Sequence, residues 1–143
     1  QMAVHLPLGN AAVLEAQMLM LSTHNILNPA NGAPIAVPSQ DMVLGLYYIS
    51  KARKSTETNT VKGEGLTFYS DEEAIIAYNE KKADLHAEVK LRRSVQDENG
   101  NSKSEIITTS IGRILFNQYV PDEVGYINDL LTKKALRNII KSR

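Results

Sequence analysis

The sequence predicts an α+β fold, in which a short strand and buried helices come first and a mixed module of helices and antiparallel strands follows. Two stretches, 11–22 and 41–50, carry apolar residues at helical spacing. Two later stretches, 86–95 and 105–120, alternate in polarity or are rich in β-branched residues, as strands are. The length of 143 residues suits one ordinary core.

The first 22 residues predict a strand and then a helix. MAVHLPL, at 2–8, reads as a short strand that ends near Pro7, because a proline ring cannot donate to a strand ladder. The helix expected at 11–22 has apolar side chains around most of its circumference, so we expect it to be buried nearly all round.

The next segment, 24–41, cannot be a helix, since it holds Pro29, Gly32, Pro34 and Pro38. We expect a stiff, irregular loop with one short extended piece at 34–37. Ser39 or Asp41 is then expected to cap the helix at 41–50. A glycine inside that helix, Gly45, suggests close packing by another backbone.

The second half of the chain begins with a polar, turn-rich stretch, 51–65, which we expect to be a flexible joint and a subdomain boundary. A short strand is expected at 66–70. Ser70, followed by three acidic residues, has the pattern of a capping box that opens a helix ending at Glu80.

The remaining residues predict a hairpin and a final helix. The strand at 86–95 should turn through DENGNSK, 97–103, into a long partner strand at 105–120, with Gly112 as a bend or bulge. An interrupted helical stretch is expected at 120–143, with its apolar residues on one face: Leu130, Ala135, Leu136, Ile139 and Ile140.

Composition excludes several classes of partner and site. Lys and Arg total 16, as do Asp and Glu, so no overall charge attracts nucleic acid or an anionic membrane. No cysteine is present, which excludes disulfides and thiolate sites. The longest apolar stretch is too short for a bilayer and lacks a basic leader, so we expect a soluble, cytoplasmic protein without membrane contact.

Four patterns that resemble chemical sites have simpler interpretations. The three histidines, His5, His24 and His86, lack the spacing of a zinc site. The acidic run 71–73 suits helix capping better than acid catalysis, and VKGEGL suits a turn better than a phosphate loop. A solvated surface is favoured over nucleic-acid binding for the basic face of the last helix, which comprises Lys133, Lys134, Arg137, Lys141 and Arg143.

The proline-rich loop is the most informative feature. It carries uncharged hydrogen-bonding side chains at Asn25, Asn28, Asn31, Ser39 and Gln40. Such groups on a stiff loop suit a neutral polar ligand group, such as a ribose hydroxyl. The alternative, that they satisfy the backbone of the loop itself, is equally compatible with the residues.

The same loop lies in a long stretch that resembles a known family. QMAVHLPL, then LEAQMLMLSTHNILNPANGAPIAVPSQDMVLGLYYIS, and later KGEGL, LHAEVKLR, TTSIGRILF and KKAL, are similar in order to the largest catalytic subunit, β′, of bacterial DNA-directed RNA polymerase. The resembling segment directly follows the NADFDGD motif of that family. The turn at 51–61 is similar to versions from the Bacteroidetes group.

The resemblance implies a position in the enzyme. Residues 1–50 would be the tail of the catalytic, active-site domain and the start of the pore region, and 51–143 the α+β module of the pore region. The Mg²⁺ ions would be bound by aspartates outside this chain, so we expect no catalytic residue, no metal ligand and no activity in the segment alone. Gln40 would approach the sugar of the incoming nucleotide or the RNA 3′ end, and Asn25 and Asp41 would order the loop.

The partners implied are the remainder of β′, the β, α and ω subunits, sigma factor, the DNA template, the RNA product and nucleoside triphosphates. Surfaces that these partners cover would be exposed in the segment alone, so we also expect self-association. Two other hypotheses stay open: a stand-alone module that binds a polar ligand or nucleic acid, and a small metal-dependent hydrolase built on the histidines.

Overall fold

The structure is a computed structural model, which describes residues 1–96 and 102–141. The chain divides into two compact units, one of residues 1–38 and 136–143 and the other of residues 39–135. Five α-helices and a three-stranded sheet in the described residues confirm the α+β class. None of these helices is long and apolar enough to cross a membrane.

The N-terminal part of the first unit corrects two expectations. Residues 1–8 form no strand, and no described residue pairs with them. A strand needs a neighbouring strand for its backbone groups, which a local pattern cannot supply. The next helix forms as α1, Asn10–Glu15, continued by a π-helical turn, Ala16–Met20, and it is not buried: Leu14 is 57% exposed and Met18 63%.

The loop of the first unit is irregular, as predicted. A 3-10 turn at Ser22–His24 precedes it, and a single bridge joins Leu27 to Pro34. Asn28 closes the tip of the loop twice, since its N–H donates to the carbonyl of Ala33 at 2.8 Å and its carbonyl accepts from Gly32 at 2.7 Å. The backbone of the loop is therefore held by its own hydrogen bonds.

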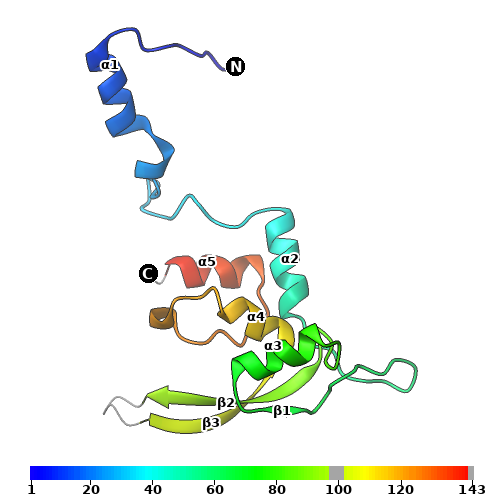
Figure 1. Cartoon of the computed structure of the whole chain (residues 1–143). Coiled ribbons are helices and arrows are strands. Elements are labelled where there is room, and N and C mark those ends of the chain that lie inside the picture. The colour runs from blue at the N-terminus through cyan, green and yellow to red at the C-terminus, as the bar shows by residue number, and fades with distance from the viewer. Residues whose placement is uncertain (97–101, 142–143) are drawn as a thin grey trace. The chain divides into compact units, whose positions relative to one another are not determined.

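The second unit is built on the sheet, whose strand order is β1-β2-β3 (Figure 1). The short β1, Thr67–Phe68, is parallel to β2, Glu88–Gln96, which pairs antiparallel with β3, Ser102–Ser110. The expected hairpin is thereby confirmed, although residues 97–101 of its turn lie outside the described residues. Every second residue of β2 faces the core, so Val89 and Leu91 are fully buried.

Two helices cover one face of this sheet (Figure 1). Ala74 of α3, Asp71–Asn79, and Ile111 and Ile114 of α4, Ile111–Asn117, belong to the same buried cluster as β2. The full cluster comprises Phe68, Ala74, Ala83, Ala87, Val89, Leu91, Ile111 and Ile114. It is the core that supports the remaining helix of the unit, α2, Asp41–Ser50.

The start of α3 confirms the predicted capping pattern. The Ser70 hydroxyl accepts from the N–H of Glu73 at 3.3 Å, and the Glu73 carboxylate accepts from the N–H of Tyr69 at 2.7 Å. Both side chains satisfy backbone donors that a helix start would leave without partners. The helix ends at Asn79, one residue before the predicted end.

The expected long strand 105–120 is wrong in its second half. The strand ends at Ser110, whose hydroxyl accepts from the N–H of Arg113 at 3.4 Å and so caps α4. Ile111 and Ile114 then face the core at helical spacing, which is why the β-branched run continues as a helix. Gly112 is consequently a helix residue and no bulge.

The final predicted stretch contains two short helices, a 3-10 turn at Asp122–Val124 and α5, Lys133–Lys141. Leu136 is the buried residue of α5. The lysines and arginine of the predicted basic face, up to Lys141, are exposed, which agrees with a solvated surface. Arg143 lies outside the described residues.

Candidate functional site

Gln40 lies at the boundary between the proline-rich loop and α2. Its backbone has φ 49° and ψ −120°, a combination that side-chain-bearing residues rarely adopt. Its carbonyl accepts from the N–H groups of Val43 at 3.1 Å and Leu44 at 3.2 Å, which begins the helix. Holding such a conformation costs about 1–3 kcal/mol, and strained residues of this kind concentrate at functional sites.

The side chain of Gln40 is exposed and, among the described residues, makes no hydrogen bond. The expected caps are absent as well, because neither Ser39 nor Asp41 caps the helix with its side chain. The N-cap position of α2 is occupied by Gln40 itself, which lies between the two expected capping residues. Asp41 is exposed in the first turn of α2, where a carboxylate interacts favourably with the helix dipole.

Asn25 belongs to the first compact unit, whereas Gln40 and Asp41 belong to the second. Its side-chain amide donates to the carbonyls of Leu19 and Leu21, both at 3.0 Å, and so ties the end of the π-helical turn to the loop. This contact is compatible with a loop-ordering role.

Two further amides of the loop are engaged by the backbone of the loop. The Asn28 side chain accepts from the N–H of Ala30 and that of Asn31 from the N–H of Ala33, each at 3.0 Å. Such turns are a common use of asparagine. The amides of the loop therefore differ in what they do. The side chains of Asn28 and Asn31 hydrogen-bond the loop's own backbone, whereas the side chain of Gln40 keeps its donors and acceptor available for a ligand.

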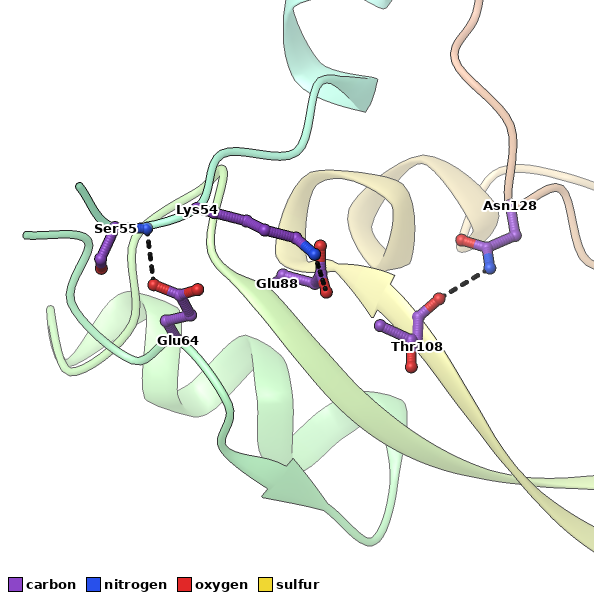
Figure 2. A network of polar contacts seen from close by, with 6 residues as sticks. All are labelled: Lys54, Ser55, Glu64, Glu88, Thr108 and Asn128. Atoms are coloured by element: carbon purple, nitrogen blue, oxygen red, sulfur yellow. Dashed lines mark hydrogen bonds and ion pairs between the residues drawn. The ribbon is translucent and has the colours of Figure 1, made fainter.

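The opposite end of α2 is anchored by polar contacts. The Arg113 guanidinium donates through Nε to the carbonyl of Ser50 at 2.9 Å, and through Nη1 to the carbonyl of Asn128 at 2.7 Å. The Asn128 side chain donates in turn to the carbonyl of Thr108 in β3 at 2.8 Å (Figure 2). One arginine thus links the end of α2 to the sheet and to the 126–131 segment.

Ser50 adds a buried contact at the same end. Its hydroxyl donates to the carbonyl of Leu46 at 2.8 Å and accepts from the N–H of Leu131 at 2.9 Å. One residue later, the carbonyl of Lys51 lies 2.8 Å from Nδ1 of the buried His86. These bonds satisfy carbonyls that the end of a helix would otherwise leave without partners.

A glycine in α4 allows that helix to pack closely against the C-terminal end of α2. It is Gly112, whereas the sequence suggested Gly45. Nothing lies within 4 Å of the position that a Cβ would take on Gly45, so the expected close packing there is wrong. A Cβ on Gly112 would lie 1.9 Å from the carbonyl oxygen of Ile49. The first turn of α4 therefore packs directly against the backbone of the last turn of α2.

These contacts fix the C-terminal end of α2, whereas its N-terminal end is exposed. Ten residues of α-helix span about 15 Å, and α2 has 10 residues. Its C-terminal end is fixed by Arg113, Ser50 and Gly112, while its N-terminal end carries the exposed Gln40 and Asp41. Sequence reasoning missed the anchoring residues, because nothing local distinguishes a serine or arginine whose partner is more than 60 positions away.

The described residues contain no cluster of metal-ligating side chains. Within 1–96 and 102–141, no three histidine, aspartate or glutamate residues form a group that could hold one. His86 is buried and engaged by Lys51, which disfavours a hydrolase built on the histidines. Asp71, Glu72 and Glu73 lie in the first turn of α3, as expected for capping.

Comparison with known proteins shows the family of the chain. The family model "RNA polymerase Rpb1, domain 3" matches residues 25–141. The chain is 66% identical over 140 residues to the DNA-directed RNA polymerase subunit beta' of Parabacteroides distasonis, covering 98% of this chain and 9% of that protein. It is 66% identical to the same subunit of Bacteroides fragilis, covering 99% of this chain, and 62% identical to that of Flavobacterium johnsoniae, covering 98%; in both cases it covers 10% of the relative.

The chain therefore spans about a tenth of the length of these relatives, as a segment of a β′ subunit does. From the family match and this identity we conclude that the chain belongs to the domain 3 family of the largest subunit of RNA polymerase.

Proposed function

We propose that this segment shapes the nucleotide-entry pore and the surroundings of the active site in a DNA-directed RNA polymerase. The enzyme would act in the cytoplasm, with the rest of β′, the β, α and ω subunits, sigma factor, DNA, RNA and nucleoside triphosphates as partners. Residues 1–50 would continue from the active-site domain and 51–143 would form the pore module. The similarity to β′ subunits along nearly the whole chain supports this proposal.

The chemistry of nucleotidyl transfer would lie outside the segment. Mg²⁺ supplies charge stabilisation for the reacting phosphate in such reactions, and its ligands would be aspartates of the remaining β′ chain. The contribution of this segment is positioning. The segment alone would bind and orient but would not catalyse.

Gln40 is the residue that would do the positioning. The observation that carries this role is an exposed carboxamide, free of hydrogen bonds within the described residues, at the presented end of an anchored helix. A carboxamide can donate to one oxygen and accept from a hydroxyl, which matches the 2′ and 3′ hydroxyls of a ribose. Asp41 and Asn25 would keep the flanking backbone in order.

The test uses the complete polymerase with Gln40→Ala in β′. Loss of one hydrogen bond costs about 1 kcal/mol, or roughly fivefold in binding, so we expect the KM for nucleoside triphosphates to rise by about that factor. Discrimination against 2′-deoxynucleotides should fall in parallel. Gln118→Ala, which truncates another exposed glutamine of the same unit, is the matched control and should leave both unchanged. An unchanged KM and unchanged sugar selectivity in Gln40→Ala would refute the role.

A further inference from the structure

A cavity of about 660 Å³ lies in the second unit, at the C-terminal side of α2 and away from Gln40 in sequence. Its walls come from three parts of the chain: Tyr48 on α2, the 53–61 turn, and the 84–86 segment before β2. Its volume is within the range of about 300–1,000 Å³ that small-molecule sites occupy. Neither the packing of the core nor the proposed role of Gln40 accounts for this cavity.

The turn that forms one wall is an ordered structure. The Glu64 carboxylate accepts from the N–H of Ser55 at 2.7 Å (Figure 2), and hydrogen bonds from Ser55 lower the pKa of that carboxyl. The Ser55 hydroxyl accepts from the N–H of Val61 at 2.9 Å, and Arg53 pairs through its backbone with the carbonyl of His86 at 2.8 Å. The wall is therefore built before any ligand arrives.

His86 supplies an unsatisfied polar group in this wall. The residue is only 7% exposed, and its Nε2 is buried without a hydrogen-bond partner among the described residues. Its Nδ1 lies 2.8 Å from the carbonyl of Lys51, so Nδ1 must donate the proton. In the neutral imidazole Nε2 is then an acceptor, and a buried acceptor without a partner is unfavourable.

Tyr48 lies against this histidine and is the more exposed member of the pair. The two rings meet edge to face with centroids 4.6 Å apart, and Tyr48 is 53% exposed. No hydrogen bond among the described residues restrains its side chain. An outward turn of this ring would open a way to the imidazole, and its exposed part offers an aromatic face for stacking.

Arg53 adds a cation to the wall. Its side chain is exposed, and no carboxylate within the described residues is paired with it. Lys54, also in the wall, is paired with Glu88 at 3.4 Å (Figure 2), and Asp84 is engaged by the N–H of Lys62 at 3.0 Å. The cavity is also lined by the Asp84 carboxylate. Of the two cations in the wall, Arg53 is the one without a carboxylate partner among the described residues, and its guanidinium is suited to bidentate binding of phosphate.

From these groups we infer a binding site for a nucleoside monophosphate whose base carries an amino group. The phosphate binds Arg53, the base stacks on Tyr48, and the amino group donates to Nε2 of His86. This site is separate from the proposed contact of Gln40 with the substrate sugar, so either proposal can fail without the other.

The experiment is photolabelling of the complete polymerase by 8-azidoadenosine 5′-monophosphate, followed by mass-spectrometric mapping of labelled peptides. We expect label on residues 48–61 or 84–86. Arg53→Gln should reduce that label about tenfold, the effect of losing roughly 1.4 kcal/mol from a charged contact. Arg92→Gln is the matched control, because Arg92 is exposed on the sheet and does not line the cavity.

Competition between nucleotides with and without the amino group tests the contact with His86. AMP should displace the label about tenfold better than purine riboside 5′-monophosphate, which lacks the amino group. Equal competition would refute the contact with His86. Absence of label at this segment, while the active site is labelled, would overturn the proposal; in that case crosslinks from a photoreactive residue at position 48 to other polymerase segments would identify a protein side chain as the occupant.

Discussion

Replacement of Gly112 by alanine tests the contact that fixes the position of α2. The new Cβ would lie 1.9 Å from the carbonyl oxygen of Ile49 and 2.9 Å from its carbonyl carbon, closer than any real Cβ contact. Both atoms are backbone, so no side chain can turn aside. The last turn of α2 or the first turn of α4 must therefore move.

The cost can be worked out from what such a movement disturbs. Overpacking costs about 1–3 kcal/mol. The shift also strains the hydrogen bonds from Gly112 to Leu85 and from Arg113 to Ser50, both at 2.9 Å, each worth about 1 kcal/mol. The higher helix propensity of alanine offsets about 1 kcal/mol of this loss of stability. We expect Gly112→Ala to lower the free energy of unfolding by about 2–4 kcal/mol.

The assay is urea unfolding followed by far-UV circular dichroism. With a slope near 2 kcal/mol per molar urea, the midpoint should fall by about 1–2 M. The matched control is Gly45→Ala, since Gly45 is also a helix glycine but nothing lies within 4 Å of its Cβ position. That variant should gain up to about 1 kcal/mol. A Gly112→Ala chain as stable as the unsubstituted chain would refute the packing argument.

Two further predictions concern ionisation and association. Burial raises the pKa of Tyr126 above its ordinary value, although its hydrogen bond to Thr109 opposes the shift; the unfolded chain therefore loses this proton first, and stability should fall as pH rises beyond about 10. Urea midpoints measured across that range should show the fall, and Tyr126→Phe should reduce it; an equal slope in both chains would contradict the assignment. The exposed apolar side chains of α1 and its π-helical extension should cause concentration-dependent self-association in sedimentation velocity, which Leu14→Glu with Met18→Glu should suppress. A monomer at every concentration would contradict that expectation.

Local signals were predicted well because their causes are local. Ser70 and Glu73 are three residues apart, and their capping bonds need nothing beyond that turn. The alternation of Val89 and Leu91 with charged residues likewise defines a strand with one buried face. The loop at 24–41 was predicted as irregular because proline and glycine act on their own backbone.

Features that need a distant partner were missed or misjudged. Residues 2–8 have the composition of a strand, yet no described strand pairs with them. The β-branched run after Ser110 becomes helix α4, because the hydroxyl of Ser110 caps it and the core accepts Ile111 and Ile114. Gly45 and Gly112 are both helix glycines, and only the approach of Ile49 distinguishes them.

The sequence by itself determined the fold class, the capped helix α3, the β2–β3 hairpin and, through long blocks of similarity, the family. It also singled out Gln40 as a polar residue on a stiff loop. Only the tertiary structure decided which amides are free to bind, which glycine lies against another backbone and how α2 is anchored. The physical reason is that free donors, close backbone contacts and buried hydrogen bonds depend on residues far away in the chain, and no local pattern records them.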